Sequence, residues 1–264
     1  MRSEGENEVS LTPANPLIVA AHELKTPLVL MRQLSLDFTD SLMKSQGDDF
    51  AKDSKIIADH IRLTSEKTLR LVDSLTRAAR LEDGLFELGP IQVTGVLREV
   101  SEEISPLSRS LKQSITVKPL QKRIGNQGSS LVVIANRELL RALILNLLDN
   151  SLQYNDSSEN IEISTRIVRK TSQNPNRDVM AEIEIRDYGD EINLRDFRKL
   201  RDNLGSVQPI SSRPLSSGLG LAIAEIFANK MGGKLDIIRH SKRGGLSFTV
   251  ALPVSRQMSL LELL

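Results

Sequence analysis

The strongest constraint on the fold is a pair of apolar heptad series near the start of the chain. The first runs from Leu17 to Leu42 in steps of four and three, and the second from Phe50 to Ala78, each with one serine in a single gap. Such spacing lines one stripe of a helix with apolar side chains. The polar stretch 44–49 separates the series, which predicts an antiparallel helical hairpin. One hairpin cannot enclose its own seam, so we expect a homodimer with a four-helix bundle.

Beyond residue 88 the pattern changes to strands interleaved with helices. Helices are expected over 137–154 and 219–231, and strands over 115–117, 131–135, 161–168, 181–188, 235–239 and 246–252. Alternation of this kind is typical of an α/β sandwich. The predicted fold class is therefore α+β, a helical hairpin followed by a sandwich. The predicted divisions are a polar lead (1–16), the hairpin (17–88), the sandwich (89–253) and a tail (254–264).

Composition excludes several classes of protein. The formal net charge is +1 and aromatic residues make up 3% of the chain, with no basic stripe, so nucleic-acid binding is not expected. The 264 residues include no cysteine, which excludes disulfides and thiol chemistry. No apolar run approaches the roughly 20 residues needed to span a bilayer. We expect a cytoplasmic chain, with membrane attachment only if a sensor region precedes Met1.

His22 is a candidate nucleophile on the first heptad helix. It falls at a solvent-facing position, and Thr26 lies one turn further along the same face. Pro27 cannot donate an N–H to the helix and should loosen this turn. An exposed imidazole beside a loosened turn can approach a second site, and Glu23 could accept its proton. On these residues alone, an ordinary surface histidine is the other interpretation.

The helix expected over 137–154 carries a stripe of amides. Asn146, Asn150 and Gln153 are spaced four and three apart and share one face. Amide oxygens can join the ligands of a hydrated Mg²⁺, and amide N–H groups can meet phosphate oxygens. A solvated polar face is the alternative interpretation of this helix.

Two further segments have the composition of nucleotide-binding loops. Asp187 lies at the end of an expected strand and could accept a hydrogen bond from an adenine amine, while Gly189 allows close approach of the backbone. Gly218, Leu219 and Gly220 precede or begin an expected helix, whose free N–H groups could reach phosphate oxygens. Taken singly, these segments are equally compatible with a turn and a helix cap.

Together, these segments resemble the catalytic core of sensor histidine kinases of two-component systems. Residues 21–28 read AHELKTPL, similar to the H-box, and residues 146–151, 187–189 and 216–221 follow in the order of the N, G1 and G2 boxes. The resemblance implies a HisKA dimerisation and phosphoacceptor hairpin and a HATPase_c domain of the GHKL, or Bergerat, type. It implies that His22 accepts phosphate, that Glu23 assists, and that Thr26 positions water during dephosphorylation of a partner.

The resemblance also implies the ligands, the reaction and the partner. ATP and Mg²⁺ would bind the second domain, with Asn146 as the metal ligand. The chain would be a protein-histidine kinase that phosphorylates its own His22 and passes the phosphoryl group to an aspartate of a response regulator. The implied nucleotide-binding residues are Asn146, Asn150, Gln153, Tyr154, Asp187, Gly189, Gly218, Leu219 and Gly220.

Three departures from the family pattern leave alternatives open. Glu191 stands where the G1 box has its second glycine, Gln153 replaces the N-box lysine, and Ser216 replaces the first G2 glycine. Each is expected to weaken ATP binding. The alternative function is a module with weak or no ATP use that docks or dephosphorylates a receiver through Thr26. A topoisomerase-like or chaperone-like ATPase is a third class, against which the H-box and the hairpin argue.

Overall fold

The computed structural model describes residues 24–25, 27–38, 48–79, 86–119, 131–155, 160–169, 179–202, 204 and 219–255. His22, Glu23, Thr26 and Gly218, which are among the predicted site residues, lie outside these ranges.

The two predicted helices of the hairpin are present and touch each other. Residues 27–38 are helical, and α2 (Asp48–Ala79) spans nearly the whole second heptad series. The hydroxyl of Ser65 donates to the sulfur of Met31 at 2.7 Å, joining the two helices. Leu28, which the heptad places in the seam, is 54% exposed in the single chain.

A five-stranded sheet forms one layer of the second domain. Its strand order is β2-β4-β5-β7-β6, with β2 parallel to β4 and the other neighbours antiparallel. The strands are β2 (Ile115–Val117), β4 (Ile161–Arg169), β5 (Val179–Arg186), β6 (Lys234–Arg239) and β7 (Leu246–Pro253). All five were expected from the sequence. Because β5 ends at Arg186, Asp187 is the first residue beyond it.

A second, two-stranded sheet closes one end of this domain. β1 (Gly89–Gln92) pairs antiparallel with β3 (Val132–Ala135). Val254 forms a bridge with Val133, and the amide of Ser255 donates to the carbonyl of Val132 at 2.9 Å. The first residues of the predicted tail are therefore attached to this sheet.

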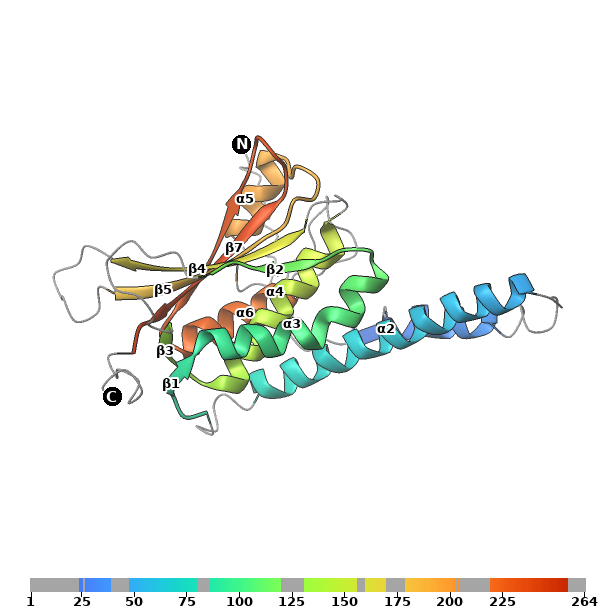
Figure 1. The fold of residues 1–264 in the computed structure, drawn as a ribbon, viewed down its shortest axis with the longest axis horizontal. Coiled ribbons are helices and arrows are strands. Elements are labelled where there is room, and N and C mark those ends of the chain that lie inside the picture. The colour runs from blue at the N-terminus through green and yellow to red at the C-terminus, as the bar shows by residue number, and fades with distance from the viewer. Residues whose placement is uncertain are drawn as a thin grey trace, which may run out of the picture.

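Three helices cover one face of the larger sheet (Figure 1). They are α3 (Val93–Ser110), α4 (Arg137–Tyr154) and α6 (Leu219–Lys230), while the shorter α5 (Leu194–Asp202) contacts β6. Side chains from the helices and the sheet interlock in one core, whose largest fully buried members include Leu97, Ile104, Leu140, Leu143, Ile144, Phe227 and Phe248. The layers form the α/β sandwich that was predicted, and the fold class is confirmed.

The helical hairpin is called the stem from here on, and its helix α2 packs against the sandwich. Its C-terminal half runs along the helical layer and contacts α6, whereas its N-terminal half projects away (Figure 1). Within the described ranges, none of the helices is both long enough and apolar enough to cross a membrane.

Candidate nucleotide-binding site

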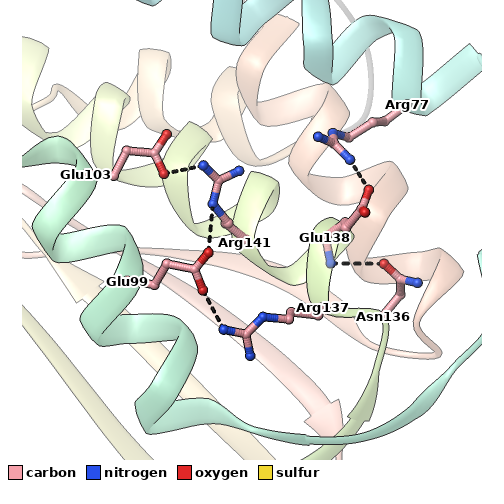
Figure 2. Close-up of polar contacts among 7 residues, drawn as sticks. All are labelled: Arg77, Glu99, Glu103, Asn136, Arg137, Glu138 and Arg141. Carbon is pink, nitrogen blue, oxygen red and sulfur yellow. Dashed lines mark hydrogen bonds and ion pairs between the residues drawn. The ribbon is translucent and has the colours of Figure 1, made fainter.

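The N-terminal half of α4 is held by a cap and by an ion pair with the stem. The side-chain oxygen of Asn136 accepts hydrogen bonds from the amides of Glu138 and Leu139 at 3.0 and 3.1 Å. Asparagine is a favoured residue at this position because it satisfies N–H groups that have no partner within the helix. Glu138 in turn pairs with Arg77 of α2 (Figure 2). The start of α4 is thereby fixed in direction.

The same half of α4 is also paired with α3. Glu99 lies 2.6 Å from Arg137 and 3.4 Å from Arg141, and Glu103 also pairs with Arg141 (Figure 2). These side chains are between about a third and a half exposed, so each pair contributes modestly, roughly 0.2–1 kcal/mol. Together they fix the position of α4 relative to α3.

The C-terminal half of α4 carries the predicted amide stripe. Asn146 is 7% exposed. The Nδ2 atoms of both Asn146 and Asn150 are buried, and within the described residues neither has a hydrogen-bond partner. Leaving a buried donor without a partner costs about 1–3 kcal/mol, and such groups are uncommon in native proteins. Two of them on adjacent turns indicate a site that a polar ligand completes.

The first turn of α6 faces this stripe. A methyl group built on Gly220 would lie 3.6 Å from Nδ2 of Asn150 and 3.9 Å from its Oδ1. The first N–H groups of a helix have no partner within the helix and favour an anion. Leu219, the residue before Gly220, has its side chain buried in the hydrophobic core, where it packs with the other core residues. The structure thus brings the amide stripe and the glycine segment at the start of α6 together at Asn150 and Gly220.

The loop after β5 packs against the end of α4, and a glycine makes this possible. A Cβ atom on Gly189 would lie 1.9 Å from the carbonyl oxygen of Tyr154, a distance that no side chain tolerates. The amide of Tyr188 donates to Oδ1 of Asn155 at 3.1 Å. Tyr154, the predicted aromatic neighbour of the nucleotide, is half-buried at this junction.

Asp187 is fully buried at the base of the same loop. Its Oδ1 accepts hydrogen bonds from the amides of Leu246 at 2.9 Å and Gly189 at 3.3 Å. Gly245 adopts φ +69°, and a Cβ there would lie 2.5 Å from that same oxygen. The carboxylate is therefore fixed by backbone groups from two loops.

A polar network on the other side of the loop was not predicted. The hydroxyl of Tyr188 and the ammonium of Lys118 donate to Glu162 at 2.8 and 2.7 Å. Burial alone would raise the pKa of Glu162, but hydrogen bonds from Lys118 and Tyr188 outweigh it and the pKa is lowered. Burial and the bond to Glu162 raise the pKa of Tyr188. The guanidinium of Arg186 stacks on the Tyr188 ring, 4.6 Å from its centroid.

Glu191, expected to crowd or repel a nucleotide, has a partner of opposite charge. Its carboxylate pairs with Arg239 of β6, and Nε of Arg239 donates to the carbonyl of Ile192 at 2.6 Å. The Glu191 side chain is 48% exposed. The ion pair with Arg239 offsets the negative charge of Glu191 and holds its carboxylate toward β6.

Gln153 also has a basic partner, and it comes from the stem. The ammonium of Lys67 in α2 donates to Oε1 of Gln153 at 2.8 Å. One turn away, Arg70 of α2 forms two hydrogen bonds with Asp149 of α4, at 3.0 and 3.1 Å. Neither contact could be predicted from sequence spacing, because the partners are 79 to 86 residues apart.

Three of the predicted segments therefore converge on the C-terminal half of α4. Residues 135–256 match the family model for the Histidine kinase-, DNA gyrase B-, and HSP90-like ATPase. This part of the chain is therefore similar to that ATPase family. The family supports ATP as the nucleotide of the converged site.

Curated relatives extend the similarity toward the N-terminus. The chain is 27% identical over 243 residues to the signal transduction histidine-protein kinase BaeS of Escherichia coli (strain K12), covering 90% of this chain and 46% of BaeS. It is 27% identical over 239 residues to the swarming motility regulation sensor protein RssA of Serratia marcescens, covering 89% of this chain and 45% of RssA. The chain spans about half the length of these relatives.

A solved structure shows the same fold. The Acinetobacter baumannii histidine kinase AdeS superposes with a TM-score of 0.54 at 18% identity, over 89% of this chain and 98% of AdeS. The match to the ATPase family and the two relatives support the interpretation of the chain as similar to a histidine-kinase catalytic core. The family match begins at residue 135, so the HisKA assignment of the hairpin stays a prediction.

Proposed function

We propose that the chain is an ATP-dependent protein-histidine kinase that phosphorylates its own His22. The observation that supports this best is the pair of buried Nδ2 atoms of Asn146 and Asn150, which have no hydrogen-bond partner among the described residues. Asn150 also faces Gly220 at the start of α6. Polar ligand oxygens would satisfy both amides. The kinase relatives and the H-box around His22 supply the acceptor.

ATP would lie along the C-terminal half of α4. Asp187 would accept a hydrogen bond from the adenine amine, and Tyr154 would border the base. The phosphates would meet the amide of Asn150 and the first N–H groups of α6 near Gly220. Gly189 holds the adenine end of the site against α4 by its close fit.

Mg²⁺ fits the oxygen chemistry of this site. In the part of the chain that the structure describes, no group of three His, Cys, Asp or Glu side chains is placed to hold a metal. Mg²⁺ commonly keeps several waters and takes the remainder of its ligands from few side chains and substrate phosphates. The side-chain oxygen of Asn146 would be its protein ligand, and the ion would offset charge on the phosphates.

The reaction is a phosphoryl transfer between ATP and an imidazole. A ring nitrogen of His22 attacks the γ-phosphorus, the N–P bond forms, and the bond to the β-phosphate oxygen breaks to release ADP. Glu23 accepts the proton that the imidazole loses. An aspartate oxygen of a response-regulator receiver then attacks the phosphorus and breaks the N–P bond. Thr26 would position water when the regulator is dephosphorylated.

Dimerisation would complete the hairpin. Large apolar side chains of both stem helices are between 38% and 65% exposed in the single chain, namely Leu28, Val29, Leu30, Leu36, Leu69 and Val72. Exposed apolar side chains on both helices of a hairpin are expected to be covered in part by a partner. A second hairpin, forming the predicted four-helix bundle, is the proposed partner.

The test is labelling of the full chain with γ-labelled ATP and Mg²⁺. The wild type should acquire label that is lost in acid and retained in base, and His22→Gln should abolish it. His60→Gln, on the other stem helix, is the matched control and should label normally. Undiminished labelling of His22→Gln would reject the acceptor, and absence of label in the wild type would reject the kinase.

The alternative, a module with little use of ATP, depended on Glu191 and Gln153. Each of these side chains contacts a basic group in the structure. Calorimetry with a non-hydrolysable ATP analogue and Mg²⁺ separates the functions, because the module would give no heat at millimolar nucleotide.

A further inference from the structure

The stem helix α2 reaches the amide stripe with a positive charge. Nζ of Lys67 lies 2.8 Å from Oε1 of Gln153. Gln153 stands seven residues, or two turns, after Asn146 and three after Asn150, so the three side chains share one face of α4. The Lys67 ammonium is therefore at the edge of the surface on which the buried amides have no partner.

The charges on α4 explain why this cation matters. Asparagine and glutamine side chains are neutral, and the nearest ionised group on the helix is the carboxylate of Asp149, whose side chain is 12% exposed. An unpaired carboxylate beside the triphosphate would repel it. Arg70 pairs with Asp149 through two hydrogen bonds and offsets that charge. Lys67, which donates to the neutral Gln153, adds a positive charge at this edge of the stripe.

We propose that Lys67 is a nucleotide-binding residue supplied by the stem. Its ammonium contacts the phosphates of ATP bound on α4 of the same chain, while Gln153 holds the ammonium in place. The inference rests on the proposed ATP site at the amide stripe. A lysine suits the role, because its four-carbon stem is flexible and its ammonium carries three donors that can serve both Gln153 and a phosphate oxygen.

The assignment links nucleotide affinity to docking of α2. The pair between Arg70 and Asp149, with side chains 17% and 12% exposed, fixes the register that places Lys67 one turn away. If α2 leaves α4, the site loses its added cation. Binding of the triphosphate therefore stabilises the docked arrangement.

The experiment is calorimetry on the full chain with a non-hydrolysable ATP analogue and Mg²⁺. Lys67→Ala should bind the analogue about two- to fivefold more weakly, the upper part of the range for a partly exposed charge contact. The loss should shrink as salt is raised from low to high concentration. Adenosine, which has no phosphates, should bind Lys67→Ala and the wild type equally.

Two further variants sharpen the result. Arg62→Ala removes another exposed cation of α2, one that pairs with Glu66 on its own helix, and should leave affinity unchanged. Adding Gln153→Lys to Lys67→Ala puts a cation back on the stripe from α4 itself and should restore affinity.

Each contrary outcome is specific. Equal affinity of Lys67→Ala and Arg62→Ala for the ATP analogue would overturn the role of Lys67 and leave the ATP site intact. Equal weakening of analogue and adenosine would assign Lys67 a structural role instead. No binding by the wild type would reject the ATP site itself, and the Lys67 assignment with it.

Discussion

The two halves of helix α4 differ: every charged side chain of the N-terminal half is ion-paired, whereas the C-terminal half also holds two buried amide donors without a partner among the described residues. In the N-terminal half, Arg137, Glu138 and Arg141 are all ion-paired, and Asn136 caps the helix. In the C-terminal half, the Nδ2 atoms of Asn146 and Asn150 have no hydrogen-bond partner among the described residues. Each neighbouring segment contacts this half at a glycine, Gly189 or Gly220. The difference shows that one helix can both hold the fold together and carry groups that only a ligand satisfies. Local departures from polar satisfaction of this kind are expected at functional sites.

The largest expected effect concerns the close packing of Gly189 against the C-terminal end of α4. In Gly189→Ala the new methyl would lie 1.9 Å from the carbonyl oxygen of Tyr154, so the loop must move. We expect about 3 kcal/mol lower free energy of unfolding and at least about tenfold weaker binding of the ATP analogue. Urea unfolding and calorimetry measure the two.

Gly95→Ala in α3 is the control for this variant. A methyl there meets nothing within 4 Å, and alanine is the better helix former, so stability should rise by roughly 0.5–1 kcal/mol. If Gly189→Ala behaved like Gly95→Ala, the packing of the loop on α4 would be wrong.

The second prediction separates the two halves directly. Asn150→Ala should weaken binding of the ATP analogue by about tenfold or more while leaving the free energy of unfolding unchanged or slightly higher, since a buried donor without a partner is removed. Arg141→Ala should do the reverse, lowering stability by about 0.5–1 kcal/mol without changing affinity. Paired calorimetry and urea unfolding test both variants. If Asn150→Ala lost stability but kept its affinity for the ATP analogue, the proposed difference between the two halves of α4 would be wrong.

Much of this comparison was accessible from the sequence. The 3.6-residue period predicted α4 and α6, and the amide spacing predicted a shared face. α3 was missed because Gly95 and Pro106 interrupt it, although Val93, Val96 and Val100 follow helical spacing. β1 was missed because its four residues begin with Gly and Pro, which usually mark a turn.

The contacts that decide the charges of the site could not be predicted. Lys67 with Gln153 and Glu191 with Arg239 join residues that are far apart in the chain, and no periodicity relates them. Sequence reasoning could therefore find the departures at Gln153 and Glu191 but not the basic groups opposite them. The absence of a partner for the amides of Asn146 and Asn150 likewise depends on how α4 and α6 pack.

The smallest expected effect concerns the pH dependence of stability that Glu162 contributes through its hydrogen bonds with Lys118 and Tyr188. The pKa of Glu162 is lowered in the folded chain, since hydrogen bonds from Lys118 and Tyr188 outweigh the effect of burial. A lowered pKa stabilises the fold above the unfolded value of about 4.3, and the contribution is lost as pH falls through the folded pKa. Glu162→Gln should therefore lose less stability than the wild type between about pH 5 and 3, and be at most about 1 kcal/mol less stable at pH 7. Identical acid slopes in urea unfolding would contradict this role.

The most direct test follows the side-chain amides of Asn146 and Asn150 by NMR during a titration with a non-hydrolysable ATP analogue and Mg²⁺. Each resonance is assigned by its loss in the alanine variant. Both side-chain amide resonances should shift together as the analogue binds. The side-chain amide resonance of Asn136, which caps the other end of α4, should not shift. If the analogue binds and neither amide responds, the nucleotide does not lie on the C-terminal half of α4.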